Sequence, residues 1–171
     1  MEKVLRLDLH NDEVLVLDNS GKSYLVRLSG RQGNVLFGEV EQVQETDERA
    51  AFQLELGFSL TKREKVELIL QKGTELGVSA FRPFVSDRSL DHNLKLDDAK
   101  RERWSAIIRE AAEQSHRTRL PAIFSPQIFK DVLVGFPQES TRLIAWEGSP
   151  PELQLNPVWF STSEGCNSAG A

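Results

Sequence analysis

Arginine and glutamine side chains in the middle third of the chain carry the groups best suited to contact a nucleic acid. Arg88, Arg103 and Arg117 each present a planar guanidinium, which binds a phosphate bidentately or stacks on an unstacked base. Gln114 can hydrogen-bond the edge of such a base. The alternative is a charged helix exterior that faces only water. We take these side chains as the main candidates for nucleic-acid contact.

A second group of cations lies near the N-terminus. Arg6, Lys22 and Arg27 fall in or beside short β-like stretches, where basic side chains can contact the phosphates that position a protein on RNA. The alternative is an ordinary solvated strand face. Residues 1–60 hold 6 Lys or Arg against 11 Asp or Glu, so the electrostatic attraction of this part for RNA is weak.

Gln71, Lys72 and Glu75 lie about one helical turn apart in a segment with helical periodicity. Lys72 and Glu75 can form an exposed ion pair worth roughly 0.2–0.5 kcal/mol. Their spacing therefore does not distinguish a functional role from a solvated helix surface.

Charge and composition restrict the function only broadly. The net charge is −5 over 171 residues, and residues 61–120 are the only basic third, with 13 Lys or Arg against 10 Asp or Glu. The histidines His10, His92 and His116 have no metal-ligand spacing, and the single cysteine, Cys166, excludes an internal disulfide. We expect no structural metal.

The apolar pattern predicts a soluble cytoplasmic protein with two compact units. No run of eighteen apolar residues occurs, and charges are spread through residues 1–9, so we expect neither a membrane span nor a secretory leader. The apolar content of 39% is enough to bury a core.

The first sixty residues predict a small β-barrel that would present the N-terminal cations. Asp18-Asn19-Ser20-Gly21 is typical of a hairpin turn because Asn and Gly tolerate a positive φ. Short strands at close spacing are typical of a small closed sheet. The five expected strands cover residues 4–7, 13–17, 24–28, 34–44 and 51–58.

An α/β domain is predicted after Ser59 to Thr61. Thr61-Lys62-Arg63-Glu64 has the capping-box pattern of a helix start, and Gly77 suits the left-handed residue after that helix. A second long helix is expected to begin at Asp97 or Asp98 and to end at Pro121. Its apolar face comprises Trp104, Ile107, Ile108, Ala111, Ala112 and Ser115.

The remaining elements alternate between strand and helix, which predicts a parallel sheet covered by helices. They are strands at residues 78–85, 122–124 and 142–146 and a short helix at 127–134. Residues 159–171 are small, polar and aperiodic, so we expect this tail to be disordered.

Three stretches carry motifs that occur together in one known family. The first is Val4-Leu5-Arg6-Leu7; the second is Leu70-Gln71-Lys72-Gly73-Thr74-Glu75-Leu76-Gly77-Val78, continuing through Pro83 to Ser86-Asp87-Arg88-Ser89. The third runs from Arg103-Trp104-Ser105 through Glu110-Ala111-Ala112-Glu113-Gln114-Ser115-His116-Arg117 to Pro121. In this order and spacing they resemble the bacterial methyltransferases of uracil N(3) in 16S rRNA. The resemblance covers about residues 3 to 158.

The resemblance implies a two-domain α+β protein that uses S-adenosylmethionine. The parts expected are an RNA-binding PUA-like barrel at 1–60, the first half of a SPOUT-type α/β methyltransferase domain at 61–158 and an aberrant tail at 159–171. It implies 16S rRNA of the small ribosomal subunit as partner and a homodimer in the family. It places Gln71, Lys72 and Glu75 beside the active site and makes RNA the expected ligand of the cations above.

The family's cofactor loops, Gly-Pro-Glu-Gly-Gly and Arg-Glu-Thr-Ala, do not occur in the sequence. We therefore expect a chain that is truncated at the C-terminus and at the N-terminus and that lacks the knot region. We expect this chain not to bind S-adenosylmethionine, not to catalyse methylation and not to form a stable homodimer. Methylation at N(3) requires an unpaired base that loses its N(3) proton. Glu75 and Glu113 suit a general base by residue type alone, so no catalytic residue is assigned.

Two other functions stay open. One is a catalytically silent RNA-binding or ribosome-associated module, which cofactor binding would distinguish from an enzyme. The other is an unrelated barrel joined to a nucleotide-binding α/β domain. It is disfavoured because no Gly-rich phosphate loop follows a predicted strand.

Overall fold

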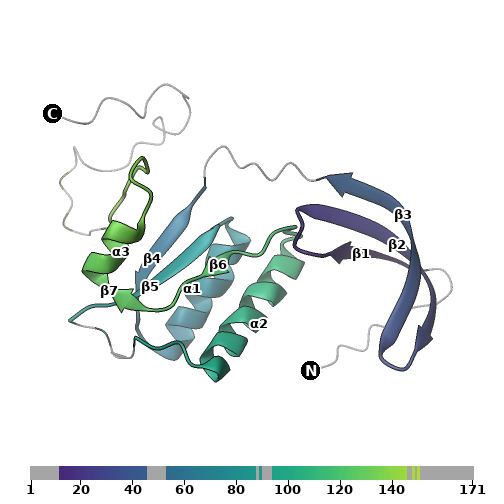
Figure 1. Ribbon diagram of the computed structural model, residues 1–171, viewed down its shortest axis with the longest axis horizontal. Helices are drawn as coiled ribbons and strands as arrows, with labels where there is room; N and C mark the ends of the chain where they lie inside the picture. Colours follow the sequence, from purple (N-terminus) through teal and green to yellow (C-terminus); the bar gives the residue numbers. More distant parts are fainter. Residues whose placement is uncertain are drawn as a thin grey trace. The chain divides into compact units, whose positions relative to one another are not determined.

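A computed structural model of the chain describes residues 12–45, 53–87, 89, 94–145, 148 and 150. The chain divides into two compact units, Met1–Leu133 and Val134–Ala171. The first unit contains an antiparallel sheet and a parallel sheet with helices (Figure 1), so the predicted mixed α and β architecture is confirmed. The expected strand at residues 4–7 and the tail at 159–171 lie outside the described residues.

The antiparallel sheet contains β1 (Glu13–Leu17), β2 (Lys22–Gln32) and β3 (Val35–Glu45), in that spatial order. The predicted hairpin turn between β1 and β2 is confirmed. Asn19 and Gly21 take φ values of 67° and 92°, and the Ser20 N–H donates to Asp18 Oδ1 at 2.9 Å. Three of the five expected barrel strands therefore pair as predicted.

The fourth described strand, β4 (Glu55–Ser59), corrects the expectation that residues 51–58 close the barrel. It pairs in parallel with β5 (Ala80–Val85), from Glu55 opposite Ala80 to Ser59 opposite Phe84. The ring of Phe58 packs edge-on against Phe81, with centroids 6.3 Å apart, so burial of this strand requires the second sheet. A β-like pattern predicts a strand but not its partner. The boundaries of the domains stay a proposal.

The other edge of β5 pairs with β6 (Ala122–Ile123) and β7 (Gln127–Ile128), both parallel to it. Because β4 occupies one edge of β5 along its length, β6 and β7 act as one interrupted strand on the opposite edge. The predicted strand at residues 122–124 is confirmed. The helix expected at 127–134 is α3 (Phe129–Gly135) and follows β7, whereas residues 142–145 form no strand, contrary to expectation.

Helix α1 (Arg63–Glu75) begins one residue later than the capping-box pattern predicts. Lys62 is the N-cap residue, and no side chain caps the helix. The Leu60 N–H still donates to the Phe84 carbonyl at 2.8 Å, so the chain leaves the sheet only after Leu60. The predicted reciprocal bonds of Thr61 and Glu64 are therefore wrong.

The end of α1 confirms the prediction that Gly77 is the left-handed residue after the helix. Gly77 has a φ of 95°, its N–H donates to the Thr74 carbonyl at 3.2 Å, and the Val78 N–H donates to the Gly73 carbonyl at 2.9 Å. These two bonds form a Schellman motif, which turns the chain from the helix into β5.

Helix α2 (Asp98–Gln114) begins as predicted, with Asp97 Oδ1 accepting the Lys100 N–H at 2.8 Å. It ends earlier than Pro121, contrary to expectation. His116 takes a φ of 55° and the Arg117 N–H donates to the Ala112 carbonyl at 2.9 Å, so the same motif closes this helix without glycine.

The core lies where α1 and α2, which pack side by side, cover the parallel sheet. The predicted apolar face of α2 is confirmed: Trp104, Ile108, Ala111 and Ala112 are buried. The central cluster comprises Phe58, Leu60, Val66, Leu70, Val78, Phe81, Leu96, Trp104 and Ile108.

Candidate functional site

A cavity of about 340 Å³ opens beside the first turns of α1 and α2. Helices that follow parallel strands begin at the carboxyl ends of those strands, where α/β proteins bind their ligands. Leu60 and Thr61, which follow β4, form one wall. The lining comprises Leu60, Thr61, Arg63, Val66, Asp97, Lys100, Arg103 and Trp104.

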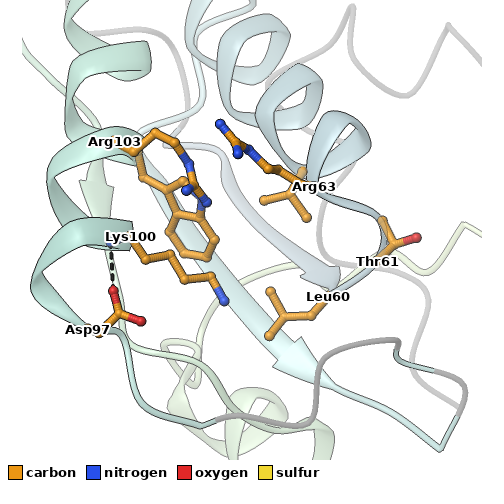
Figure 2. Close-up of a pocket in the computed structure, with 8 residues that line it drawn as sticks. Leu60, Thr61, Arg63, Asp97, Lys100 and Arg103 are labelled. Carbon is orange, nitrogen blue, oxygen red and sulfur yellow. Dashed lines mark hydrogen bonds between the residues drawn. The ribbon is translucent and has the colours of Figure 1, made fainter.

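The lining is predominantly cationic. Lys100 and Arg103 extend from α2 and Arg63 extends from α1 into the same region (Figure 2). Among the lining residues that the structure describes, Asp97 is the only acid, and its Oδ1 accepts the Lys100 N–H as the cap of α2. The Lys100 ammonium lies 5.1 Å from the ring centroid of Trp104, which forms the apolar floor.

Glu67 holds two of these cations together. Its Oε1 lies 2.7 Å from Arg63 Nε and 3.0 Å from Arg103 Nε, and the contact with Arg103 lacks the alignment of a hydrogen bond. The hydrogen bond to Glu67, together with its negative charge, raises the pKa of Arg63. Both contacts use Nε, so the terminal nitrogens of the two guanidinium groups lie outside these ion pairs.

Of the sequence-predicted residues that the structure describes, only Arg103 lines this cavity. Sequence reasoning missed Arg63 and Lys100, although both lie near the start of a predicted helix. Placing both helix starts at the same edge of the sheet would have found them. Arg88 lies outside the described residues.

Gln114 lies at the opposite end of α2, about 16 Å along the helix from Arg103 at 1.5 Å per residue, and Arg117 follows just after the helix. Gln114 is exposed. Arg117 Nη1 donates to the carbonyl oxygens of Thr74 at 3.0 Å and Val78 at 2.7 Å, so it joins the ends of α1 and α2. Contact of either residue with RNA stays a prediction.

The signature around Gln71 lies in the last turns of α1 and begins five residues after Val66, which lines the cavity. Lys72 Nζ and Glu75 Oε2 form the exposed ion pair that the spacing allowed, at 2.7 Å. Gly73 faces Phe81 so closely that an added Cβ would lie 2.7 Å from the ring. Much of this motif therefore has a packing explanation, and a role beside an active site stays a prediction.

The N-terminal cations within the described residues are paired with acids. Lys22 Nζ lies 2.8 Å from Glu45, and hydrogen bonding and charge from that carboxylate raise the pKa of Lys22. Arg27 lies 2.6 Å from Glu41. RNA would have to displace these carboxylates; Arg6 lies outside the described residues.

Serine hydroxyls attach the loop after β5 to the end of β4. Ser59 Oγ lies 3.0 Å from both Ser86 Oγ and Ser89 Oγ, and the Ser86 N–H donates to Ser89 Oγ at 2.8 Å. The Ser-Asp-Arg-Ser motif is therefore held at the carboxyl edge of the sheet by its two serines.

Other kinds of site are not found in the part of the chain that the structure describes. Among those residues, no group of three His, Cys, Asp or Glu side chains could hold a metal ion. Among the same residues, no helix has the length and apolarity needed to cross a membrane.

The sequence model of the RNA methyltransferase domain matches residues 48–164. The match spans both helices and the parallel sheet, and it includes the residues that line the cationic cavity. The chain therefore belongs to the RNA methyltransferase domain family.

Named relatives place the chain more closely. It is 41% identical over 105 residues to Ribosomal RNA small subunit methyltransferase E of Bacillus subtilis (strain 168), covering 59% of this chain and 40% of that protein. The protein of the same name from Synechocystis sp. (strain ATCC 27184 / PCC 6803 / Kazusa) is 34% identical over 131 residues, covering 75% of this chain and 41% of that protein. The resemblance inferred from the motifs is confirmed.

A solved structure shares the fold. The crystal structure of a Ribosomal RNA small subunit methyltransferase E from Neisseria gonorrhoeae, bound to S-adenosyl methionine, matches with a TM-score of 0.72 and 30% identity. The match covers 82% of this chain and 57% of that one. The chain thus spans about two fifths of the length of the two curated relatives.

Proposed function

We propose that the protein acts in the S-adenosylmethionine-dependent methylation of uracil N(3) in 16S rRNA of the small ribosomal subunit. The observation that carries this proposal is the 41% identity to the small subunit rRNA methyltransferase of Bacillus subtilis. The Neisseria gonorrhoeae structure, which holds S-adenosyl methionine, supports the choice of methyl donor.

The described residues fit the RNA better than they fit the methyl donor. S-adenosylmethionine carries a positively charged sulfonium, whereas the described lining of the cavity presents Arg63, Lys100 and Arg103 with one acid, Asp97, and Glu67 pairs with the two arginines. Like charges at this range repel, so the cavity disfavours the sulfonium and suits an anion. When bound, the cofactor supplies the methyl group; we assign that binding to no residue described in this structure.

The role proposed for these 171 residues is to position RNA. A uracil N(3) lies on the pairing edge, so the base has to leave its stack before it can react. Holding the flanking backbone in place turns much of the reaction into an intramolecular step. The proposal assigns no general base: Glu75 is ion-paired with Lys72, and Glu113 lies on the exposed surface of α2.

A second candidate function is RNA binding without catalysis. The cationic character of the cavity favours it. The two functions differ in their effect on RNA chemistry, because only the first changes a nucleoside.

Deleting the gene in its source organism and analysing 16S rRNA nucleosides by mass spectrometry tests the catalytic proposal. We expect loss of 3-methyluridine. An unchanged level of 3-methyluridine would contradict the proposal and leave the RNA-binding alternative. Calorimetric titration of the 171-residue chain with S-adenosylmethionine tests the assignment of these residues to RNA. Saturable one-site binding would contradict that assignment.

A further inference from the structure

The cavity between the first turns of α1 and α2 has no ligand assigned by the reaction itself. We propose that it binds one phosphate group of the RNA backbone through Arg63, Lys100 and Arg103. The inference rests on the proposed function, because it takes RNA as the source of the phosphate.

Charge is the first argument for a phosphate. Three cationic side chains line the cavity against Asp97, whose Oδ1 already accepts the N–H of Lys100. Trp104 is only 1% exposed and provides an apolar wall beneath Lys100, which weakens screening by water. A bound anion would add a negative charge beside the guanidinium groups of Arg63 and Arg103, which share the Glu67 carboxylate.

The start of α1 is the second argument. The helix has thirteen residues, and its N-cap residue, Lys62, makes no side-chain cap, in contrast to Asp97 of α2. The backbone N–H groups of an uncapped first turn and the positive end of the helix dipole both favour a phosphate. Thr61, which precedes this turn, adds a hydroxyl to the lining.

Glu67 is the third argument, because it acts as an internal counterion. One of its carboxylate oxygens contacts both Arg63 and Arg103 through their Nε atoms. This arrangement holds the two guanidinium groups near each other while their terminal nitrogens stay outside the ion pairs. A phosphate, with more acceptor oxygens than one carboxylate, can bridge these terminal nitrogens.

The binding test uses the 171-residue chain and a fluorescein-labelled, uridine-containing 20-nucleotide single-stranded RNA. Fluorescence anisotropy measures Kd at several KCl concentrations. We expect Arg63→Gln, Lys100→Gln and Arg103→Gln each to weaken binding about three- to tenfold. In the triple variant the slope of log K against log salt should fall by about 0.7, the value for one lost phosphate contact on a single strand.

A matched control and a gain-of-affinity variant separate this effect from misfolding. Arg109→Gln removes an exposed cation from α2 outside the cavity and should change Kd less than about twofold. Glu67→Gln removes the internal counterion and should strengthen RNA binding by about threefold. Circular dichroism checks the fold of each variant.

Three results would overturn the inference: cavity variants that bind like Arg109→Gln, a Glu67→Gln variant that binds RNA more weakly, or a wild-type chain without RNA affinity. The second experiment titrates the chain with inorganic phosphate. Saturable phosphate binding without RNA binding would mean a free-phosphate site and refute RNA as the source. RNA binding that persists in every cavity variant would refute the phosphate site but not the proposed function. The 3-methyluridine measurement tests the proposed function independently.

Discussion

Replacing Gly73 by alanine tests whether the signature in α1 is a packing motif. A Cβ added there would lie 2.7 Å from Cε1 and 2.9 Å from Cζ of Phe81. Carbon atoms in contact lie about 3.5–4.0 Å apart, so the ring would have to move by about 1 Å. Phe81 is fully buried and packs edge-on against Phe58, so it has no solvent-facing side into which to move.

Two opposing terms set the expected size of the effect. Alanine is more favourable than glycine in a helix interior by about 1 kcal/mol. Overpacking a buried site costs about 1–3 kcal/mol. Because Phe81 cannot relax outward, we expect Gly73→Ala to lower the free energy of unfolding by about 1 kcal/mol, with the packing term exceeding the helix propensity. Phe81→Leu should make room for the methyl group and offset at least about 1 kcal/mol of the cost in the double variant.

Urea unfolding of the parent, both single variants and the double variant, followed by tryptophan fluorescence, measures these differences. Lys65→Ala, at an exposed position on the same helix, is the control and should stay within about 0.5 kcal/mol of the parent. A Gly73→Ala variant that is as stable as the parent, or more stable, would refute the close-packing explanation. So would additive effects of the two substitutions.

Three other predictions concern helix ends and the hairpin. His116→Gly should raise the free energy of unfolding by about 0.5–1 kcal/mol in urea, because His116 has a φ of 55° at the end of α2; a loss of stability would contradict strain there. Arg117→Ala removes a donor from the buried Thr74 carbonyl and should cost about 1–3 kcal/mol, seen as a lower Tm; an unchanged Tm would show that water replaces it. Hydrogen bonds from the Ser20 side chain and backbone lower the pKa of Asp18 from 3.8. Its contribution to stability should therefore be present above pH 3.8 and be lost as pH falls through the lower folded pKa, which carboxyl NMR titration of parent and Ser20→Ala would reveal; equal midpoints would contradict this cause.

Local patterns were sufficient to predict several elements of this protein. The Asp97 cap and the apolar stripe through Trp104 and Ile108 predicted α2 because both operate within a few residues of sequence. Gly77 predicted the end of α1, and the turn around Asn19 predicted the first hairpin, because a positive φ restricts residue type directly.

Only the tertiary structure decided which of these elements meet. β4 has the pattern of another barrel strand, yet burial of Phe58 against Phe81 pairs it with β5. Arg117 has the type of an RNA contact, yet its guanidinium joins α1 to α2.

The candidate site shows the same division. Sequence reasoning singled out Arg103 by residue type but could not associate it with Arg63 and Lys100. Their association depends on two helices starting at one edge of a parallel sheet, with Glu67 between the two guanidinium groups. Residue type and spacing determine what a side chain can bind and which local element holds it. Contacts between distant segments determine its neighbours, because their free energy exists only after the chain has folded.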